Sequence, residues 1–228
     1  MKSNRQKPSA QERKRVLILD DHPLTRRGLV QLIDNEPDLI SCGEAGTAEE
    51  ALARIRAPLP DLVLADLSLG GKSGLEFIKD MQALHPTIPV LALSMYNETI
   101  YAERVLRAGG RGYVMKTEGG EKVLQAIRQV LQGRTFVSDD LSASIIHRFA
   151  QGSQSRVDAG LALLTDREFE IFQLLGSGLS SREISRQLHV SIPTVGTHRM
   201  HIKEKLKLTT IAQLVQYAVC WVGGQWMG

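Results

Sequence analysis

Four apolar residues stand between two aspartates in Pro60-Asp61-Leu62-Val63-Leu64-Ala65-Asp66. A short run that is apolar at every position is typical of a strand covered on both faces of a parallel sheet. Similar runs occur at Val16–Leu19, Leu39–Glu44, Val90–Leu93 and Gly112–Met115. Because helix-like segments separate these runs, the first part of the chain predicts a doubly wound parallel α/β sheet.

Two local signals predict helix boundaries within this region. Thr47-Ala48-Glu49-Glu50 has the spacing of a capping box, in which the first and last side chains accept backbone N–H groups at the start of a helix. Gly109-Gly110 predicts the end of a helix that runs from about Thr99 to Ala108.

After Gly133 the strand pattern stops. Ser138-Asp139-Asp140 predicts the start of a short helix, and Gln151-Gly152-Ser153-Gln154-Ser155 has the composition of a linker. Capping signals then begin three helices, at Thr165, Ser180 and Ser191.

A fourth helix is predicted from about Thr209 to Val222. We therefore expect a flexible basic tail at 1–14, an α/β domain at 15–134, a linker with a short helix at 135–160, and a small all-α domain of four helices at 161–228.

The net charge of +3 over 228 residues hides an uneven distribution. Residues 1–15 carry six basic side chains and one acidic, residues 16–135 carry 13 basic and 16 acidic, and residues 161–228 carry seven basic and five acidic. A basic excess in the small domain favours a nucleic-acid contact, although a solvated basic surface has the same composition.

The composition excludes several classes of protein. No apolar run reaches the roughly 18–20 residues of a membrane span, and no apolar segment follows the basic N-terminus as in a signal peptide. Cys42 and Cys220 are far apart and lack metal-ligand spacing, which favours two buried thiols in a reducing compartment. We expect a cytoplasmic protein without membrane contact.

Polar side chains follow four of the predicted strands: Asp20, Asp21, Asp66, Ser94 and Lys116. In a parallel sheet of this kind the carboxyl ends of the strands meet at one edge, where ligands bind. Clustered carboxylates repel one another unless a hard cation such as Mg²⁺ lies among them. A lysine and a serine beside them suit a phosphoryl group, whose charge needs neutralising on several sides.

Other interpretations of these residues remain open at this point. Each aspartate on its own is a common turn former at a strand end. Gly71-Lys72-Ser73 resembles the end of a phosphate-binding loop, but Asp66 occupies the place of its first glycine. A metal-dependent phosphatase is disfavoured because Asp66-Leu67-Ser68 lacks the second aspartate of the haloacid-dehalogenase type.

The α/β region resembles the receiver domain of two-component response regulators, which has a flavodoxin-like (βα)5 fold. The matching motifs are Leu19-Asp20-Asp21-His22-Pro23, Pro60 to Asp66, Ser94 and Gly112-Tyr113-Val114-Met115-Lys116. One departure is Gly70, which stands where the family commonly has proline.

The resemblance implies a role for each residue of the strand-end cluster. Asp66 would accept a phosphoryl group from a partner histidine kinase. Asp21 would ligate Mg²⁺ together with Asp66 and the backbone carbonyl of Ser68, and Asp20 would act through water. Lys116 would pair with the phosphoryl oxygens, Ser94 would turn its hydroxyl toward them, and Tyr113 would rotate inward as the switch.

Residues from about Leu164 to Leu208 resemble the LuxR-type helix-turn-helix of NarL/FixJ response regulators. The matching motifs are Leu164 to Glu168, Gly178 to Ile184, Leu188 to Ser191, and Thr194-Val195-Gly196-Thr197-His198. The second helix of such a motif enters the major groove of double-stranded DNA, and the helix before it contacts phosphates. We expect DNA contacts from Arg182, Arg186, Thr194, Thr197, His198, Arg199 and Lys203.

Two departures and one alternative accompany this resemblance. Gly196 stands where the family often has lysine, and His189 where the turn usually has glycine. Histidine tolerates left-handed backbone better than most residues do, so a turn at His189 is still expected. The histidines and lysines of this region would also suit a solvated surface without DNA.

The last predicted helix has an apolar stripe: Ile211, Leu214, Val215, Ala218, Val219 and Val222. This stripe suits both a buried core face and a dimer contact, which the resemblance implies. Together the two resemblances imply a phosphorylation-regulated, DNA-binding transcription regulator, with no enzymatic activity beyond its own phosphotransfer and a homodimer when phosphorylated. The alternative is a dimeric regulator whose receiver domain is structural and insensitive to phosphate.

Overall fold

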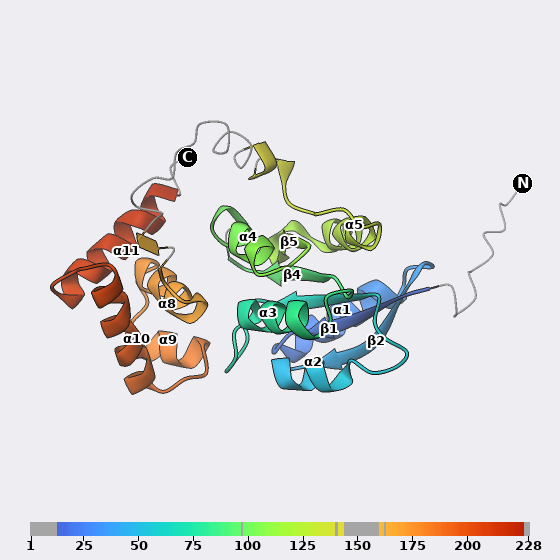
Figure 1. Ribbon diagram of the computed structural model, residues 1–228, viewed down its shortest axis with the longest axis horizontal. Helices are drawn as coiled ribbons and strands as arrows, with labels where there is room; N and C mark the ends of the chain where they lie inside the picture. The colour runs from blue at the N-terminus through green and yellow to red at the C-terminus, as the bar shows by residue number, and fades with distance from the viewer. Residues whose placement is uncertain (1–12, 97, 140, 144–159, 162, 226–228) are drawn as a thin grey trace, which may run out of the picture. The chain divides into compact units, whose positions relative to one another are not determined.

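The structure is a computed structural model that describes residues 13–96, 98–139, 141–143, 160–161 and 163–225 (Figure 1). The chain divides after Ala143 into two compact units. The described residues of the first unit form five strands: β1 (Lys14–Leu19), β2 (Leu39–Ala45), β3 (Leu62–Asp66), β4 (Val90–Ser94) and β5 (Gly112–Met115). The strands are all parallel and lie in the order β2-β1-β3-β4-β5.

Helices follow the strands in turn: α1 (Pro23–Asp34), α2 (Ala48–Arg54), α3 (Gly74–Leu84), α4 (Glu98–Arg107) and α5 (Gly120–Leu131), with a 3₁₀ turn, η1 (Lys116–Glu118), after β5. Helices α1 and α5 contact each other on one face of the sheet, while α3 contacts α2 and α4 on the other. The predicted doubly wound sheet is confirmed.

Burial on both faces of the sheet explains why the strands are apolar at every position. In β3, Leu62 and Leu64 join a core that includes Ile33 of α1 and Ile127 of α5, and all four are at most 1% exposed. Val63, which alternates with them along the strand, is also fully buried. A polar side chain within such a strand would be desolvated, so polar side chains are found at the strand ends.

Two local details differ from the predictions. β1 begins at Lys14 rather than Val16, because the Lys14 backbone N–H donates to the carbonyl of Asp38 at 2.8 Å and its Nζ pairs with Asp61 at 2.9 Å. The Thr47 hydroxyl caps α2 as expected, by accepting the N–H of Glu50. The Glu50 carboxylate, however, accepts the N–H of Gly46 rather than that of Thr47.

The described part of the second unit contains four helices: α8 (Asp166–Gly176), α9 (Ser181–Gln187), α10 (Ile192–Lys205) and α11 (Ile211–Gln225). Thr165 and Ser180 form complete capping boxes with Glu168 and Glu183, and Ser191 caps α10. His189 adopts a φ of 51° in the turn between α9 and α10, which histidine tolerates.

The core of this unit is small and partly aromatic. Ile184, Val195, Ile202 and Leu214, from three helices, are all fully buried. The centroid of the Trp221 ring lies 5.7 Å from the ring centroids of Phe169 and Phe172, so aromatic packing joins α11 to α8. The helical content of the C-terminal domain is therefore confirmed.

The expectation of two buried thiols is wrong for one of them, because Cys220 is exposed on α11 and only Cys42 is partly buried. Among the described residues, no helix is both long enough and apolar enough to cross a membrane.

Replacement of Gly74 by alanine is expected to destabilise the first unit. A Cβ at this first residue of α3 would lie 2.3 Å from the backbone oxygen of Asp66 and 2.5 Å from the Cα of Leu67, so backbone would have to move. We expect a loss of roughly 2–3 kcal/mol in the free energy of unfolding, measured by far-UV circular dichroism during urea titration.

Gly28→Ala is the matched control for this substitution. Gly28 lies within α1, and a Cβ there meets nothing within 4 Å. Alanine should therefore stabilise the helix by roughly 0.5–1 kcal/mol through its backbone propensity. Equal effects of the two substitutions would contradict the steric explanation.

The second unit should lose stability in acid through Glu168. This carboxylate accepts a hydrogen bond from Lys205 Nζ at 2.6 Å and one from the Thr165 N–H at 2.8 Å. Burial acts to raise the pKa of Glu168, but these partners outweigh it and hold the pKa below its usual value. The stabilisation is therefore present above the unfolded-state pKa of about 4.3 and is lost as the pH falls through the lower folded pKa.

Glu168→Gln tests this linkage. We expect the substitution to lower the free energy of unfolding by roughly 1–3 kcal/mol at pH 7, with a difference that shrinks as the wild type protonates in acid. Both tryptophans of the chain, Trp221 and Trp226, belong to the second unit, so tryptophan fluorescence reports its unfolding. A difference that stays constant down to pH 3 would contradict the assignment.

Candidate functional site

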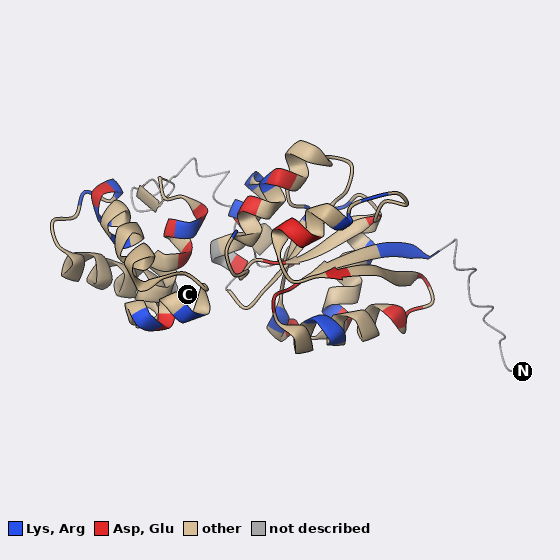
Figure 2. Cartoon of the chain, turned by 90° about the horizontal axis from the view of Figure 1, so that it is seen from below, with Lys and Arg blue, Asp and Glu red and all other residues tan. Residues whose placement is uncertain are grey.

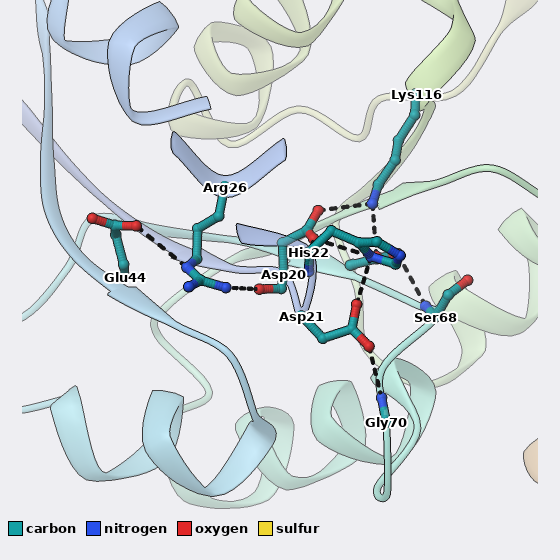
Figure 3. A network of polar contacts seen from close by, with 9 residues as sticks. Asp20, Asp21, His22, Arg26, Glu44, Ser68, Gly70 and Lys116 are labelled. Carbon is teal, nitrogen blue, oxygen red and sulfur yellow. Dashed lines mark hydrogen bonds and ion pairs between the residues drawn. The ribbon is translucent and has the colours of Figure 1, made fainter. Parts of the chain in front are cut away.

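The carboxyl ends of three strands and the turn after β5 bring the predicted polar residues together. Asp66 ends β3, Ser94 ends β4, Asp20 directly follows β1, and Lys116 directly follows β5. Lys116 Nζ lies 2.7 Å from Asp20 Oδ2, a contact drawn in Figure 3. It also lies 2.7 Å from Asp66 Oδ2, so one ammonium pairs with both carboxylates.

The acidic cluster is deeply buried and carries more negative than positive charge. The side chains of Asp20 and Asp66 are each 1% exposed, and that of Asp21 is 15% exposed. Burial raises the pKa of Asp66 to about 6; Lys116 acts against this rise, while Asp20 adds to it. Three carboxylates beside one ammonium leave an excess of negative charge, which a divalent cation with a preference for oxygen ligands would offset.

Four side chains offer ligand atoms for such a cation: Asp20, Asp21, His22 and Asp66 each place one within 4.8 Å of the others. His22 was not among the predicted site residues. Its Nδ1 lies 2.7 Å from Asp21 Oδ1 and 3.6 Å from Asp20 Oδ1, and the side chain is 66% exposed. The imidazole therefore lies at the solvent side of the cluster.

Backbone N–H groups hold the carboxylates in place. Asp66 Oδ1 accepts the N–H of Ser68 at 3.0 Å, and Asp21 Oδ2 accepts the N–H of Gly70 at 3.1 Å. A proline at position 70 has no N–H to donate. The departure from the family pattern at Gly70 therefore adds a hydrogen bond to one of the predicted metal ligands.

Sequence reasoning also missed the outer contacts of the cluster. Arg26 of α1 donates from Nη1 to the backbone oxygen of Asp20 at 2.6 Å and from Nε to Glu44 at 3.3 Å (Figure 3). The guanidinium thus joins the end of β1 to β2. The only sequence signal was a cation six residues after Asp20, which is too common to single out.

Ser94 and Tyr113 are connected through the backbone of Tyr96. Ser94 is fully buried, and its Oγ accepts the N–H of Tyr96 at 3.1 Å. Tyr113 is also fully buried and donates its hydroxyl to the carbonyl of Tyr96 at 2.7 Å. Burial raises the pKa of Tyr113, so its hydroxyl stays protonated as the donor. The Tyr113 side chain therefore lies inside the unit in this structure.

The predicted DNA-contacting residues differ in their exposure. The exposed ones are Arg182 and Arg186 on α9 and Thr197 on α10. The half-buried ones are Thr194, His198, Arg199 and Lys203, and two of these lie close to side chains of other helices in the unit. Arg199 donates to the Ser181 hydroxyl of α9 at 2.6 Å, and His198 places a nitrogen within 4.8 Å of Glu168 on α8.

The exposed residues of α10 include two large apolar side chains that were not predicted as contacts, Ile192 and Met200, which are 50% and 42% exposed. Figure 2 shows both basic and acidic residues on the helices of this unit. Charge alone therefore does not mark a DNA interface on this unit, although Arg182 and Arg186 of α9 present two exposed cations.

Glu168, His198 and His201 form a second group with ligand atoms within 4.8 Å of one another. Lys205 already donates to the Glu168 carboxylate at 2.6 Å and offsets its charge. An ammonium in this position opposes a divalent cation, so the group is better explained as a polar contact between α8 and α10.

Two protein-family models match this chain. The response regulator receiver domain matches residues 16–128, and the luxR family of bacterial regulatory proteins matches residues 162–218. The first match covers the sheet with its strand-end cluster, and the second covers α8, α9, α10 and part of α11.

Similar whole proteins and solved structures agree with these matches. The chain is 32% identical over 210 residues to the oxygen regulatory protein NreC of Staphylococcus epidermidis (strain ATCC 35984), covering 90% of this chain and 96% of the relative. It is 33% identical over 209 residues to NreC of Staphylococcus aureus (strain MRSA252), with the same coverage.

A LuxR-family two-component response regulator from Aurantimonas sp. SI85-9A1 covers 60% of this chain and 99% of its own, at 31% identity and a TM-score of 0.56. The RcsB response regulator of Salmonella typhimurium covers 92% of this chain and 98% of its own, at 22% identity and a TM-score of 0.61, which shows a shared fold.

One conclusion follows from the buried acidic strand ends, the helix-turn-helix, and relatives that are about 32% identical over 90% of the chain. The chain belongs to the response regulators that combine a receiver domain with a luxR-type DNA-binding domain, and it is a phosphorylation-regulated transcription regulator.

Proposed function

We propose that Asp66 is the residue that accepts the phosphoryl group. The observation that supports this most is the buried contact of Lys116 with both Asp66 and Asp20, at 2.7 Å each. A carboxylate at a strand end beside an ammonium is placed to become an acyl phosphate, because the ammonium offsets the charge that the phosphoryl oxygens bring.

Mg²⁺ is the proposed cofactor, and it would neutralise phosphoryl charge when bound. Asp21, Asp66 and the backbone carbonyl of Ser68 would hold it, with Asp20 acting through water. The excess negative charge of the buried cluster supports this assignment. The hydrogen bonds from Ser68 and Gly70 orient two of the carboxylates before any cation binds.

The proposed phosphoryl donor is a phosphohistidine of a sensor histidine kinase. A carboxylate oxygen of Asp66 attacks the phosphorus, an O–P bond forms, and the N–P bond of the phosphohistidine breaks. The imidazole nitrogen of the kinase keeps the electron pair and takes up a proton. Lys116 would stay beside the phosphoryl oxygens, and Ser94 would donate its hydroxyl to one of them. This self-directed transfer is the only catalysis that we propose.

A change at Ser94 has a short route to β5. If the Ser94 hydroxyl turned toward a phosphoryl group, its hydrogen bond from the Tyr96 N–H would be disturbed. The carbonyl of Tyr96 in turn accepts the hydrogen bond of the Tyr113 hydroxyl on β5. Phosphorylation would therefore shift the balance between two arrangements of this region.

The proposed DNA contacts come from α9 and α10. The N-terminal part of α10 would enter the major groove of double-stranded DNA with Thr194, Thr197, His198 and Arg199, while Arg182, Arg186 and Lys203 would contact phosphates. Arg199 and His198 would have to exchange their contacts within the unit for contacts to DNA.

We further propose a homodimer of the phosphorylated protein, located in the cytoplasm. On α11, Leu214 and Ala218 of the apolar stripe are fully buried, whereas Val219 is 46% exposed. The stripe is therefore divided between the core and the surface, as expected if its outer part contacts a second copy.

Asp66→Asn is the decisive test of the phosphoacceptor. After incubation with acetyl phosphate and Mg²⁺, the wild type should carry an acyl phosphate, detected by mass spectrometry, and should bind selected DNA fragments roughly 5- to 150-fold more tightly than before. Asp66→Asn should show neither change, because an amide oxygen is a poor nucleophile toward phosphorus.

Asp61→Asn is the matched control, since it changes an aspartate at the opposite end of the same strand, where it contacts Lys14. It should respond to acetyl phosphate as the wild type does. A wild type that binds DNA equally well with and without the acyl phosphate would instead favour a structural receiver domain.

Arg182→Ala and Arg186→Ala should weaken DNA binding in a salt-dependent manner. If each guanidinium contacts one phosphate, each substitution should lower the slope of log K against log salt by about 1, with little change in sequence preference. Fluorescence anisotropy between about 50 and 200 mM salt measures the slope.

Arg27→Ala removes the same charge from an exposed position on α1 of the receiver domain and serves as the control. An equal change of slope in this control would mean that net charge, rather than a contact from α9, accounts for the effect.

A further inference from the structure

The first residues beyond α5 belong to the receiver sheet. Phe136 forms a parallel bridge with Gly112, the first residue of β5. The Phe136 N–H donates to the carbonyl of Arg111 at 3.1 Å, and the Tyr113 N–H donates to the carbonyl of Phe136 at 2.8 Å. We call residues 136–138 the docked segment, because Phe136 pairs with β5 and Ser138 is hydrogen-bonded to α4 before the chain leads into the linker.

The Phe136 side chain is also buried in the receiver domain. Phe136 is 4% exposed and belongs to the main core, with Lys122 Nζ 5.5 Å from the centre of its ring. A Cβ at Gly112 would lie 2.7 Å from the Phe136 carbonyl oxygen. The absence of a side chain at Gly112 is therefore a condition for this close approach.

A second anchor holds the same segment to α4. Glu98, the first residue of α4, is 9% exposed, and its Oε1 accepts the N–H of Ser138 at 2.7 Å. A buried carboxylate that accepts a backbone N–H makes a strong, charge-assisted hydrogen bond. The Ser138 hydroxyl in turn accepts the N–H of Leu141, which is 1% exposed.

The docked segment is held to β5, which contains Tyr113, and to α4, which begins two residues after Tyr96. Phe136 is bonded to the backbone of Tyr113 itself, and Glu98 begins the helix that follows Tyr96 along the chain. Tyr96 and Tyr113 are joined by the hydrogen bond of the Tyr113 hydroxyl. A rearrangement between α4 and β5 must therefore change the distance between the two points that hold the docked segment.

We propose that the docked segment couples the phosphorylation site to the DNA-binding domain, with Glu98 as the residue that couples it to α4. The Glu98–Ser138 bond is made in one of the two arrangements of α4 and β5 and broken in the other. The state of Asp66 thereby controls how firmly the start of the linker is held. This inference rests on the proposed function and adds to it the route by which the site regulates DNA binding.

Substitutions at Glu98 test the coupling in the full-length chain. In Glu98→Ala no acceptor remains, so the ratio of DNA affinities with and without the acyl phosphate should fall at least about fivefold toward one. In Glu98→Gln a neutral acceptor remains, so the ratio should stay between those of the wild type and Glu98→Ala. Acyl phosphate formation on Asp66 should be unchanged in both, because Glu98 is not part of the phosphorylation site.

Glu103→Ala is the matched control on the same helix. Glu103 pairs with Arg107 one turn further along α4. The affinity ratio of this variant should equal that of the wild type, and a fall as large as that of Glu98→Ala would overturn the specific role of Glu98.

Hydrogen exchange of the wild type provides a second measurement that does not depend on the folding of any variant. The exchange rates of the amides of Phe136 and Ser138 should differ between the free and the phosphorylated protein. Unchanged exchange rates, or a normal affinity ratio in folded Glu98→Ala, would overturn the inference. If no acyl phosphate forms on Asp66 of the wild type, the result would instead contradict the proposed role of Asp66.

Discussion

The contact of one ammonium with two buried carboxylates is the interaction on which the site depends. Lys116 follows β5, Asp20 follows β1 and Asp66 ends β3. Lys116 Nζ lies 2.7 Å from each of the two carboxylates, whose side chains are almost closed to water. Burial without the lysine would favour neutral carboxylic acids. With it, the pKa of Asp66 is about 6, and the cluster keeps an excess of negative charge that a divalent cation would offset.

Strand β5 connects the site to the segment that follows α5. Ser94 and Tyr113 share the backbone of Tyr96, and Tyr113 shares its own backbone N–H with Phe136. The Tyr113 side chain reaches Tyr96 after the end of β4, while its backbone pairs with Phe136 near the start of β5. A charge change at Asp66 thus has a short covalent and hydrogen-bonded route to residue 136.

Much of the receiver domain could be predicted because burial on both sides leaves a strong pattern. The apolar run before Asp66 marks a central strand, and the polar residue that ends it marks the site. The contacts of Arg26, Glu98 and Phe136 could not be predicted, because they join residues six or more positions apart along the chain. Such pairs leave no periodicity in the sequence.

By itself, the sequence determined the elements and their capping: the order of strands and helices, the helix starts at Thr165, Ser180 and Ser191, and the residue types at the strand ends. These features depend on neighbours a few residues away. Only the tertiary structure decided that Gly70 orients Asp21, that His198 and Arg199 contact neighbouring helices, and that the chain after α5 joins the sheet. The reason is physical: these contacts depend on which distant backbone groups remain to be hydrogen-bonded once the core has formed.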